Sequence, residues 1–136
     1  MPYASPFALV QAWLDTANQQ AGDSLVALST PDIEVAGPRG SGHGSQLLRD
    51  WLSRAGLHLT TLRAFARDSV VVVAQHAVWR SAETREVIGE QDLASRFRVE
   101  GQLVAQFARH DNLDVALTEA GLHYGDEIPT TVEPGT

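Results

Sequence analysis

The spacing of apolar positions divides the chain into a helical first half and a β-rich second half. Apolar residues from Phe7 to Ala21 recur every three or four positions, the spacing of a helix that buries one face. Ser5 before Pro6 is typical of a helix start, and Gly22 of a helix end. The full pattern predicts helices over residues 5–21, 23–28, 45–55 and 113–120, and strands over residues 32–37, 57–67, 69–81, 86–101 and 102–112.

This order of elements predicts an α+β domain with an antiparallel sheet, because helices precede a run of hairpin-connected strands. The strand over residues 69–81 is apolar on both faces, with Val71 and Val73 on one and Val70 and Val72 on the other. Both of its faces are therefore expected to be covered. Helices can cover one face, and a second copy of the chain is the simplest cover for the other.

The composition of the chain excludes several classes of function. The 136 residues carry a net charge of −7, and all ten basic residues are scattered arginines, so nucleic-acid binding is not expected. The absence of Lys excludes a lysine Schiff base, and the absence of Cys excludes disulfides and thiolate chemistry. Neither a signal peptide nor a long apolar run is recognisable, so we expect a cytoplasmic protein without membrane contact. One domain over residues 1–124 and a polar, flexible tail over residues 125–136 are predicted.

The glycine-rich stretch "VAGPRGSGHGSQLLRDWL" over residues 35–52 lies between a predicted strand and a predicted helix, as phosphate loops do. The Walker A spacing is present from Gly37 to Gly42, but His43 and Gly44 stand where Lys and Ser or Thr are needed. The spacing of a dinucleotide-binding loop is absent as well. The stretch is therefore interpreted as a tight connector that uses glycine for its backbone conformations.

Titratable residues form no recognisable metal motif. The five histidines, at positions 43, 58, 76, 110 and 123, lack the spacings of metal ligands, so no metal and no cofactor is expected. Glu90 and Asp92 share one face of a predicted strand and could serve acid–base chemistry. Because Arg96 and Arg98 share that face, an exposed, salt-bridged surface is the preferred interpretation.

Several strings, in this order of elements, resemble the nuclear transport factor 2-like superfamily. They are "AGD" (residues 21–23), "LVALSTPDIEVAGPRG" (25–40), "GSGHGSQLLRDWL" (40–52) and "FRVEGQLVAQFARHDN" (97–112). The resemblance is greatest to its SnoaL-like polyketide cyclase and ketosteroid isomerase branch. It implies a cystatin-like cone, in which a curved antiparallel sheet wraps around the long N-terminal helix, with two further short helices. It also implies a small apolar ligand in the open end, and a homodimer formed through the convex sheet face.

The catalytic residues of ketosteroid isomerases do not carry over to this chain. The resemblance places their general-base aspartate at Gly37, their oxyanion-binding tyrosine near Trp13 and their protonated aspartate at Leu93. Without the base and both oxyanion donors, that mechanism is lost.

The same alignment of patterns predicts which residues line a ligand cavity. The result is a mostly apolar pocket with a few amides and one imidazole, suited to a small apolar or weakly polar molecule. The predicted lining comprises Val73, Gln75, Ala77, Gln91, Leu93, Gln106, Ala108 and His110 from the strands, with Trp13, Trp51 and His43 from the helices and loop.

Three functions remain open from the sequence. The leading one is a small-molecule-binding protein with no assignable catalytic residues. The second is a cyclase, isomerase or hydrolase that uses His110 as its acid or base, because an imidazole exchanges protons near neutral pH. The third is a noncatalytic dimerisation domain whose cone is filled with side chains.

Overall fold

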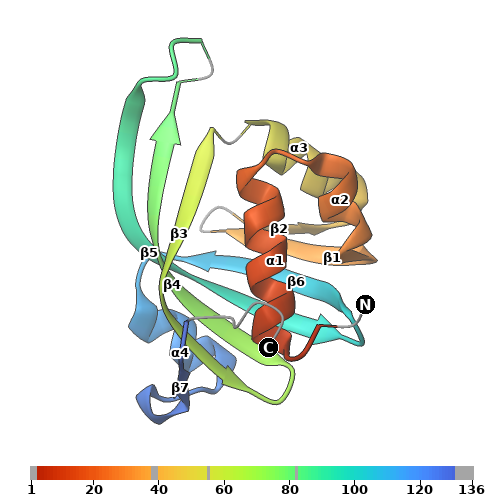
Figure 1. Ribbon diagram of the computed structural model, residues 1–136, viewed down its shortest axis with the longest axis vertical. Helices are drawn as coiled ribbons and strands as arrows, with labels where there is room; N and C mark the ends of the chain where they lie inside the picture. The colour runs from red at the N-terminus through yellow and green to blue at the C-terminus, as the bar shows by residue number, and fades with distance from the viewer. Residues whose placement is uncertain (1–2, 38–39, 55, 82, 131–136) are drawn as a thin grey trace.

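The computed structural model describes residues 3–37, 40–54, 56–81 and 83–130. They form an α+β fold in which one curled sheet wraps around the first helix (Figure 1). The elements are α1 (Pro6–Asn18), α2 (Gly22–Ala27), β1 (Ser29–Gly37), β2 (Gly40–His43), α3 (Ser45–Arg54), β3 (Leu57–Arg67), β4 (Val70–Arg80), β5 (Val87–Glu100), β6 (Leu103–His110), α4 (Leu113–Ala120), the 3₁₀ helix η1 (Tyr124–Asp126) and β7 (Glu127–Ile128).

The sheet has the strand order β2-β1-β6-β5-β4-β3-β7. Its neighbours are antiparallel, as predicted, except that β1 runs parallel to β6. The strands curl so that one face is concave, and α1 lies against that face (Figure 1). The β4–β5 hairpin is long and projects beyond the rest of the fold.

Local chemistry fixes both ends of α1. The Ser5 hydroxyl accepts a hydrogen bond from the Ala8 amide, and Pro6 occupies the first turn, where its missing N–H costs nothing. At the other end, the Asn18 side chain makes two hydrogen bonds of 2.9 Å with the backbone of Leu59. These bonds attach the end of the helix to β3 and so fix its position along the concave face.

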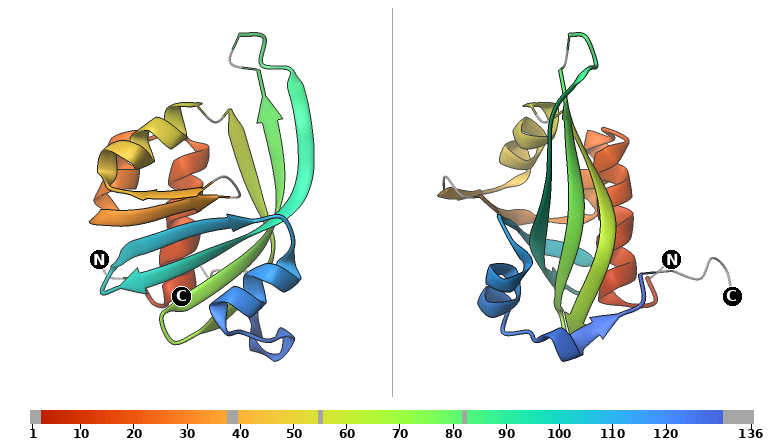
Figure 2. Two further views of the ribbon diagram at one scale, coloured as in Figure 1. Left: turned by 180° about the vertical axis from the view of Figure 1, so that it is seen from behind. Right: turned by 90° about the vertical axis from the view of Figure 1, so that its left-hand side faces the viewer.

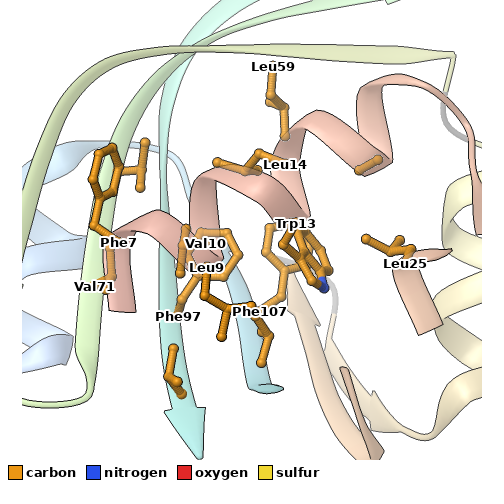
Figure 3. Close-up of a cluster of buried hydrophobic side chains, with 14 of the residues drawn as sticks. Phe7, Leu9, Val10, Trp13, Leu14, Leu25, Leu59, Val71, Phe97 and Phe107 are labelled. Carbon is orange, nitrogen blue, oxygen red and sulfur yellow. The ribbon is translucent and has the colours of Figure 1, made fainter. Parts of the chain in front are cut away.

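Trp13 lies at the centre of the core between α1 and the sheet (Figure 3). Its ring centroid is 5.5 Å from that of Phe97 and 5.0 Å from that of Phe107. Its indole Nε1 donates to Ser29 Oγ at 2.9 Å, and Ser29 Oγ donates to the Leu25 carbonyl. Because Trp13 is fully buried and its polar atom is satisfied, the interior of the cone around it is packed core.

Helix α4 covers part of the convex face, on the side of the sheet opposite α1 (Figure 2). It packs over Phe65, Val72 and Ala94, which are fully buried. The sequence predicted that both faces of β4 are covered. On the convex face, a helix of the same chain therefore provides part of this cover. Farther along the strand, Ala74, His76 and Val78 are only half-buried. A homodimer through this remaining surface stays a prediction.

The C-terminal segment returns to the sheet. After α4, the 3₁₀ helix η1 leads into β7, where Ile128 pairs with Ala64 and Glu127 with Phe65 of β3. Glu127 also forms a two-pronged ion pair with Arg63. Residues 127 and 128 thus join the sheet, and residues 131–136 lie outside the described chain. The flexible tail over residues 125–136 stays a prediction. Within the described residues, no helix is both long and apolar enough to cross a membrane.

Candidate ligand pocket at the mouth of the cone

The strand residues predicted to face the cone from β4 and β5 do lie on the concave side. Gln75 pairs with Leu93 and Ala77 with Gln91, so these four share the face of Val73. Val73, Gln75, Ala77 and Leu93 are buried, whereas Gln91 is exposed. The buried ones pack in the interior of the cone instead of lining a pocket.

The prediction for β6 is wrong, because Gln106, Ala108 and His110 lie on the convex side. A β-bulge is the cause: Arg98 pairs with Gln106, whereas Val99 pairs with Val104, which leaves one extra residue in β6. Beyond this bulge the alternation reverses, and a strict period of two selects the wrong face. Beyond the bulge, the concave positions of β6 are instead Phe107, which contacts Trp13, and Arg109.

On the convex side, these residues join a chain of hydrogen bonds across three strands. Gln106 donates to Glu34 at 2.6 Å and accepts from Arg96 at 3.0 Å. Arg96 Nε also donates to His110 Nε2 at 3.3 Å. Glu34, Gln106, Arg96 and His110 therefore form one polar network on the outside of the cone.

His110 does not have the surroundings of a general base. Burial, and secondly the charge of Arg96, lower its pKa below the ordinary 6.5. In the neutral ring, Nε2 accepts from Arg96, so the hydrogen is assigned to Nδ1 and the one lone pair is occupied. No carboxylate of the described residues hydrogen-bonds to the ring. The orienting acid that an enzyme based on His110 would need is thus missing from the described part of the chain.

A pocket of about 600 Å³ opens at the mouth of the cone. The β1–β2 hairpin, α3 and the end of β6 form its walls. Trp51 is the one predicted ligand-binding residue in the lining; Trp13 is buried beneath it, and His43 is exposed at the end of β2. The lining residues are Val35, Ala36, Gly37, Gly40, Ser41, Gly42, Leu47, Trp51, Phe107 and Arg109.

The glycine-rich stretch forms the hairpin wall of this pocket. The sequence analysis predicted a connector, but residues 40–43 form strand β2, which pairs antiparallel with β1. Gly42 allows close approach, because a Cβ there would lie 2.6 Å from Leu47 Cδ2 of α3 and would force the Leu47 side chain to move. At Gly40 and Gly44, the φ angles of +135° and +106° favour glycine. The glycines therefore allow the hairpin to pack against α3 and shape the mouth of the cone.

Aromatic rings form the apolar floor of the pocket. The Phe107 ring centroid lies 5.0 Å from that of Trp51 and 5.0 Å from that of Trp13. Since Trp13 is buried behind them, Trp51 and Phe107 are held by the core while remaining part of the pocket wall. The sequence pattern missed Phe107, because the bulge that places it on the concave face has no recognisable signal in the sequence.

Arg109 is the one charged side chain among the described lining residues. It is half-buried, and its guanidinium carbon lies 5.9 Å from the ring centroid of Trp79. The described arginines that form ion pairs are Arg49, Arg63 and Arg98, and Arg109 is not among them. The pocket thus combines an apolar floor with one positive charge.

The acids Glu90 and Asp92 do share a face, but they bind a histidine. His76 Nδ1 lies 2.7 Å from Asp92, and Nε2 lies 3.0 Å from Glu90. The hydrogen bond to Asp92, followed by that to Glu90, raises the pKa of His76. The acids are exposed, as predicted, but their partner is His76, whereas Arg98 pairs with Glu100 and Arg96 bonds to Gln106 and His110. Within the described chain, no cluster of three or more His, Asp or Glu residues is arranged to hold a metal ion.

At the positions that correspond to the catalytic residues of ketosteroid isomerases, this chain has residues that cannot act as the base or as the oxyanion donors. Gly37 lines the pocket without a side chain, and Leu93 is buried and apolar. The Trp13 N–H is already bonded to Ser29. The pocket therefore contains neither the carboxylate base nor the oxyanion donors of those enzymes.

Comparison with known proteins identifies the fold. No protein-family model matches the chain, and no curated protein matches it significantly. Solved structures do match, and their fold is that of nuclear transport factor 2-like, SnoaL-like polyketide cyclase and ketosteroid isomerase-like proteins, as the sequence resemblance implied.

Three of these structures illustrate the likeness. A candidate SnoaL-like polyketide cyclase from Shewanella putrefaciens is 12% identical, with 85% of this chain and 84% of that chain covered and a TM-score of 0.67. A ketosteroid isomerase-like protein from Catenulispora acidiphila is 17% identical, with 85% and 93% covered and a TM-score of 0.66. TerC is 15% identical, with 85% and 98% covered and a TM-score of 0.68. At these identities, the likeness establishes the fold alone.

Proposed function

We propose that this chain binds a small, largely apolar molecule in the pocket at the mouth of the cone. The observation that carries the proposal is the pocket itself: about 600 Å³, open to solvent on one side and floored by Trp51 and Phe107. That volume is typical of sites for small organic ligands, which combine an apolar lining with few polar groups.

Proteins of the same fold offer limited support. TerC was crystallised with polyporic acid, and the Catenulispora acidiphila protein was crystallised with trimethylamine. These two molecules differ in chemistry, so the shared fold does not indicate which ligand this chain binds. The class of ligand has to be inferred from the residues that line this chain's own pocket.

The two alternative functions have less support. An enzyme based on His110 would use a ring that lies outside the cone and already accepts a hydrogen bond from Arg96. A domain with a completely filled cone agrees with the packing around Trp13 but leaves the open pocket beside Trp51 without a role. Small-molecule binding accounts for both the packed interior and the open mouth.

A pair of glycine substitutions tests the proposal. Naphthamide serves as a neutral, planar probe, with binding followed by titration of ¹⁵N-labelled protein in NMR spectra. A Cβ at Gly37 or at Gly125 meets no atom within 4 Å, so either position can accept a leucine, but only Gly37 lines the pocket. We expect Gly37→Leu to weaken probe binding by about tenfold or more, because the side chain occupies the site.

Gly125→Leu is the matched control and should bind the probe as the wild type does. The amide shifts of the wild type should concentrate in the β1–β2 hairpin, α3 and the end of β6. Equal probe binding by the two leucine variants would contradict a ligand site at the mouth.

A further inference from the structure

The position of Arg109 is unusual for an arginine in an acidic protein. The chain has a net charge of −7, and the ion pairs of Arg49, Arg63 and Arg98 all lie on exposed surface. Arg109 is half-buried in the wall of an apolar pocket, and no carboxylate of the described residues pairs with it. Partial burial of a guanidinium is unfavourable unless another group compensates for the lost water.

The surroundings of Arg109 compensate only in part. The ring of Trp79 lies beside the guanidinium, with 5.9 Å between the guanidinium carbon and the ring centroid, which provides a weak attraction. Ser95 is its cross-strand neighbour on the concave face, but the Ser95 hydroxyl donates to Gln75. The guanidinium N–H groups therefore have no acceptor among the described residues, and they border the pocket.

The position of Gly37 adds to this arrangement. Gly37 lines the same pocket as Arg109, and Ala36 and Ala108, which precede them, pair between β1 and β6. A carboxylate at Gly37 would be available to pair with Arg109, but glycine has no side chain. The positive charge of Arg109 thus has no acidic side chain beside it in the described lining of the pocket.

From these observations we infer that the ligand is a planar organic anion: Arg109 binds its carboxylate or comparable oxyanion, while its apolar body lies against Trp51 and Phe107. This inference rests on the proposed function and specifies the class of ligand. A guanidinium matches a carboxylate with two parallel hydrogen bonds, and a low-dielectric setting strengthens such charge-assisted bonds. The flat rings of the floor suit a flat, conjugated body.

The test compares naphthoate with naphthamide, which share one ring system and differ in charge. Isothermal titration should give the wild type an affinity for naphthoate about tenfold or more above that for naphthamide. In Arg109→Gln, the affinity for naphthoate should fall by about tenfold or more, and that for naphthamide by less than about threefold. Arg98→Gln is the matched control: it removes the same charge from an exposed ion pair with Glu100 and should bind both probes normally.

A second pair of variants tests the same inference without changing Arg109. Gly37→Asp provides a carboxylate that competes for the guanidinium, and Gly37→Asn is its neutral counterpart. The Asp variant should bind naphthoate about tenfold more weakly than the Asn variant, and both should bind naphthamide alike. This pair remains informative if circular dichroism shows that Arg109→Gln does not fold.

The outcomes separate the inference from the proposed function. If the wild type binds neither probe, both are contradicted. Equal binding of the two probes at the pocket would retain the proposed function and overturn the anion inference. Preference for naphthoate that persists in Arg109→Gln and in Gly37→Asp would also overturn it, because another cation would then bind the carboxylate.

Discussion

Replacing Trp13 with phenylalanine distinguishes a core residue from a ligand-binding residue. Trp13 is fully buried, and its indole nitrogen donates to Ser29 Oγ. Loss of this hydrogen bond costs about 1 kcal/mol. Truncation of a buried Trp to Ala costs about 3–5 kcal/mol, and phenylalanine keeps roughly two-thirds of the side chain beyond Cβ, so the smaller ring adds about 1–2 kcal/mol. Trp13→Phe should therefore destabilise the fold by about 2–3 kcal/mol.

Urea unfolding followed by far-ultraviolet circular dichroism measures this cost without relying on tryptophan fluorescence. With an m-value of about 2 kcal/mol per molar urea, the midpoint should fall by about 1–1.5 M. Trp51→Phe is the matched control, because Trp51 is half-buried and lines the pocket. Its cost should stay below about 1 kcal/mol.

Probe binding should show the opposite order. Naphthamide affinity should fall more in Trp51→Phe than in Trp13→Phe, since only Trp51 touches the pocket. If Trp13→Phe left the urea midpoint unchanged but abolished probe binding, the assignment of Trp13 to the core would be refuted and a site deep inside the cone would be indicated.

Two further predictions concern the convex face. The stability that His76 contributes is complete below pH 6.5 and is lost as pH rises through its raised folded-state pKa. The stability that His110 contributes is present above pH 6.5 and is lost as pH falls through its lowered folded-state pKa. Urea midpoints at about pH 5.5 and 8.5 should therefore show His76→Gln destabilising mainly at the lower pH and His110→Gln mainly at the higher; the same trend for both would contradict the assignment. If the predicted dimer forms, light scattering should give the wild type a mass of twice its 14.7 kDa chain and Val78→Asp a smaller mass. Val115→Asp on α4 is the control and should keep the wild-type mass. A monomeric wild type would contradict the predicted dimer.

The sequence was sufficient for the fold because its main signals are local. The cap at Ser5, the apolar stripe of α1 and the hairpin-connected strands each depend on nearby residues, and all of them recur in the structure. Strand β2 was missed, because three of its four residues are glycine or serine and carry no β-pattern. The cover that α4 provides for the convex face depends on long-range packing, which periodicity does not specify.

The candidate site was harder to predict, because it depends on the register of a single strand. A bulge beside Val99 reverses the alternation in β6 and exchanges Gln106 and His110 for Phe107 and Arg109. One extra residue thus changed the predicted lining from an amide and an imidazole to an aromatic ring and a cation. The burial of Trp13 could not be predicted either, because an apolar helix face has the same sequence pattern whether it contacts a ligand or the sheet.

The most direct test of the account is a crystal structure of the protein grown with naphthoate. We expect density for the naphthalene ring between the β1–β2 hairpin and α3, against Trp51 and Phe107, with the carboxylate at Arg109. Density beside His110 and Arg96 on the convex face, or in the interior next to Trp13, would contradict the placement of the site at the mouth of the cone.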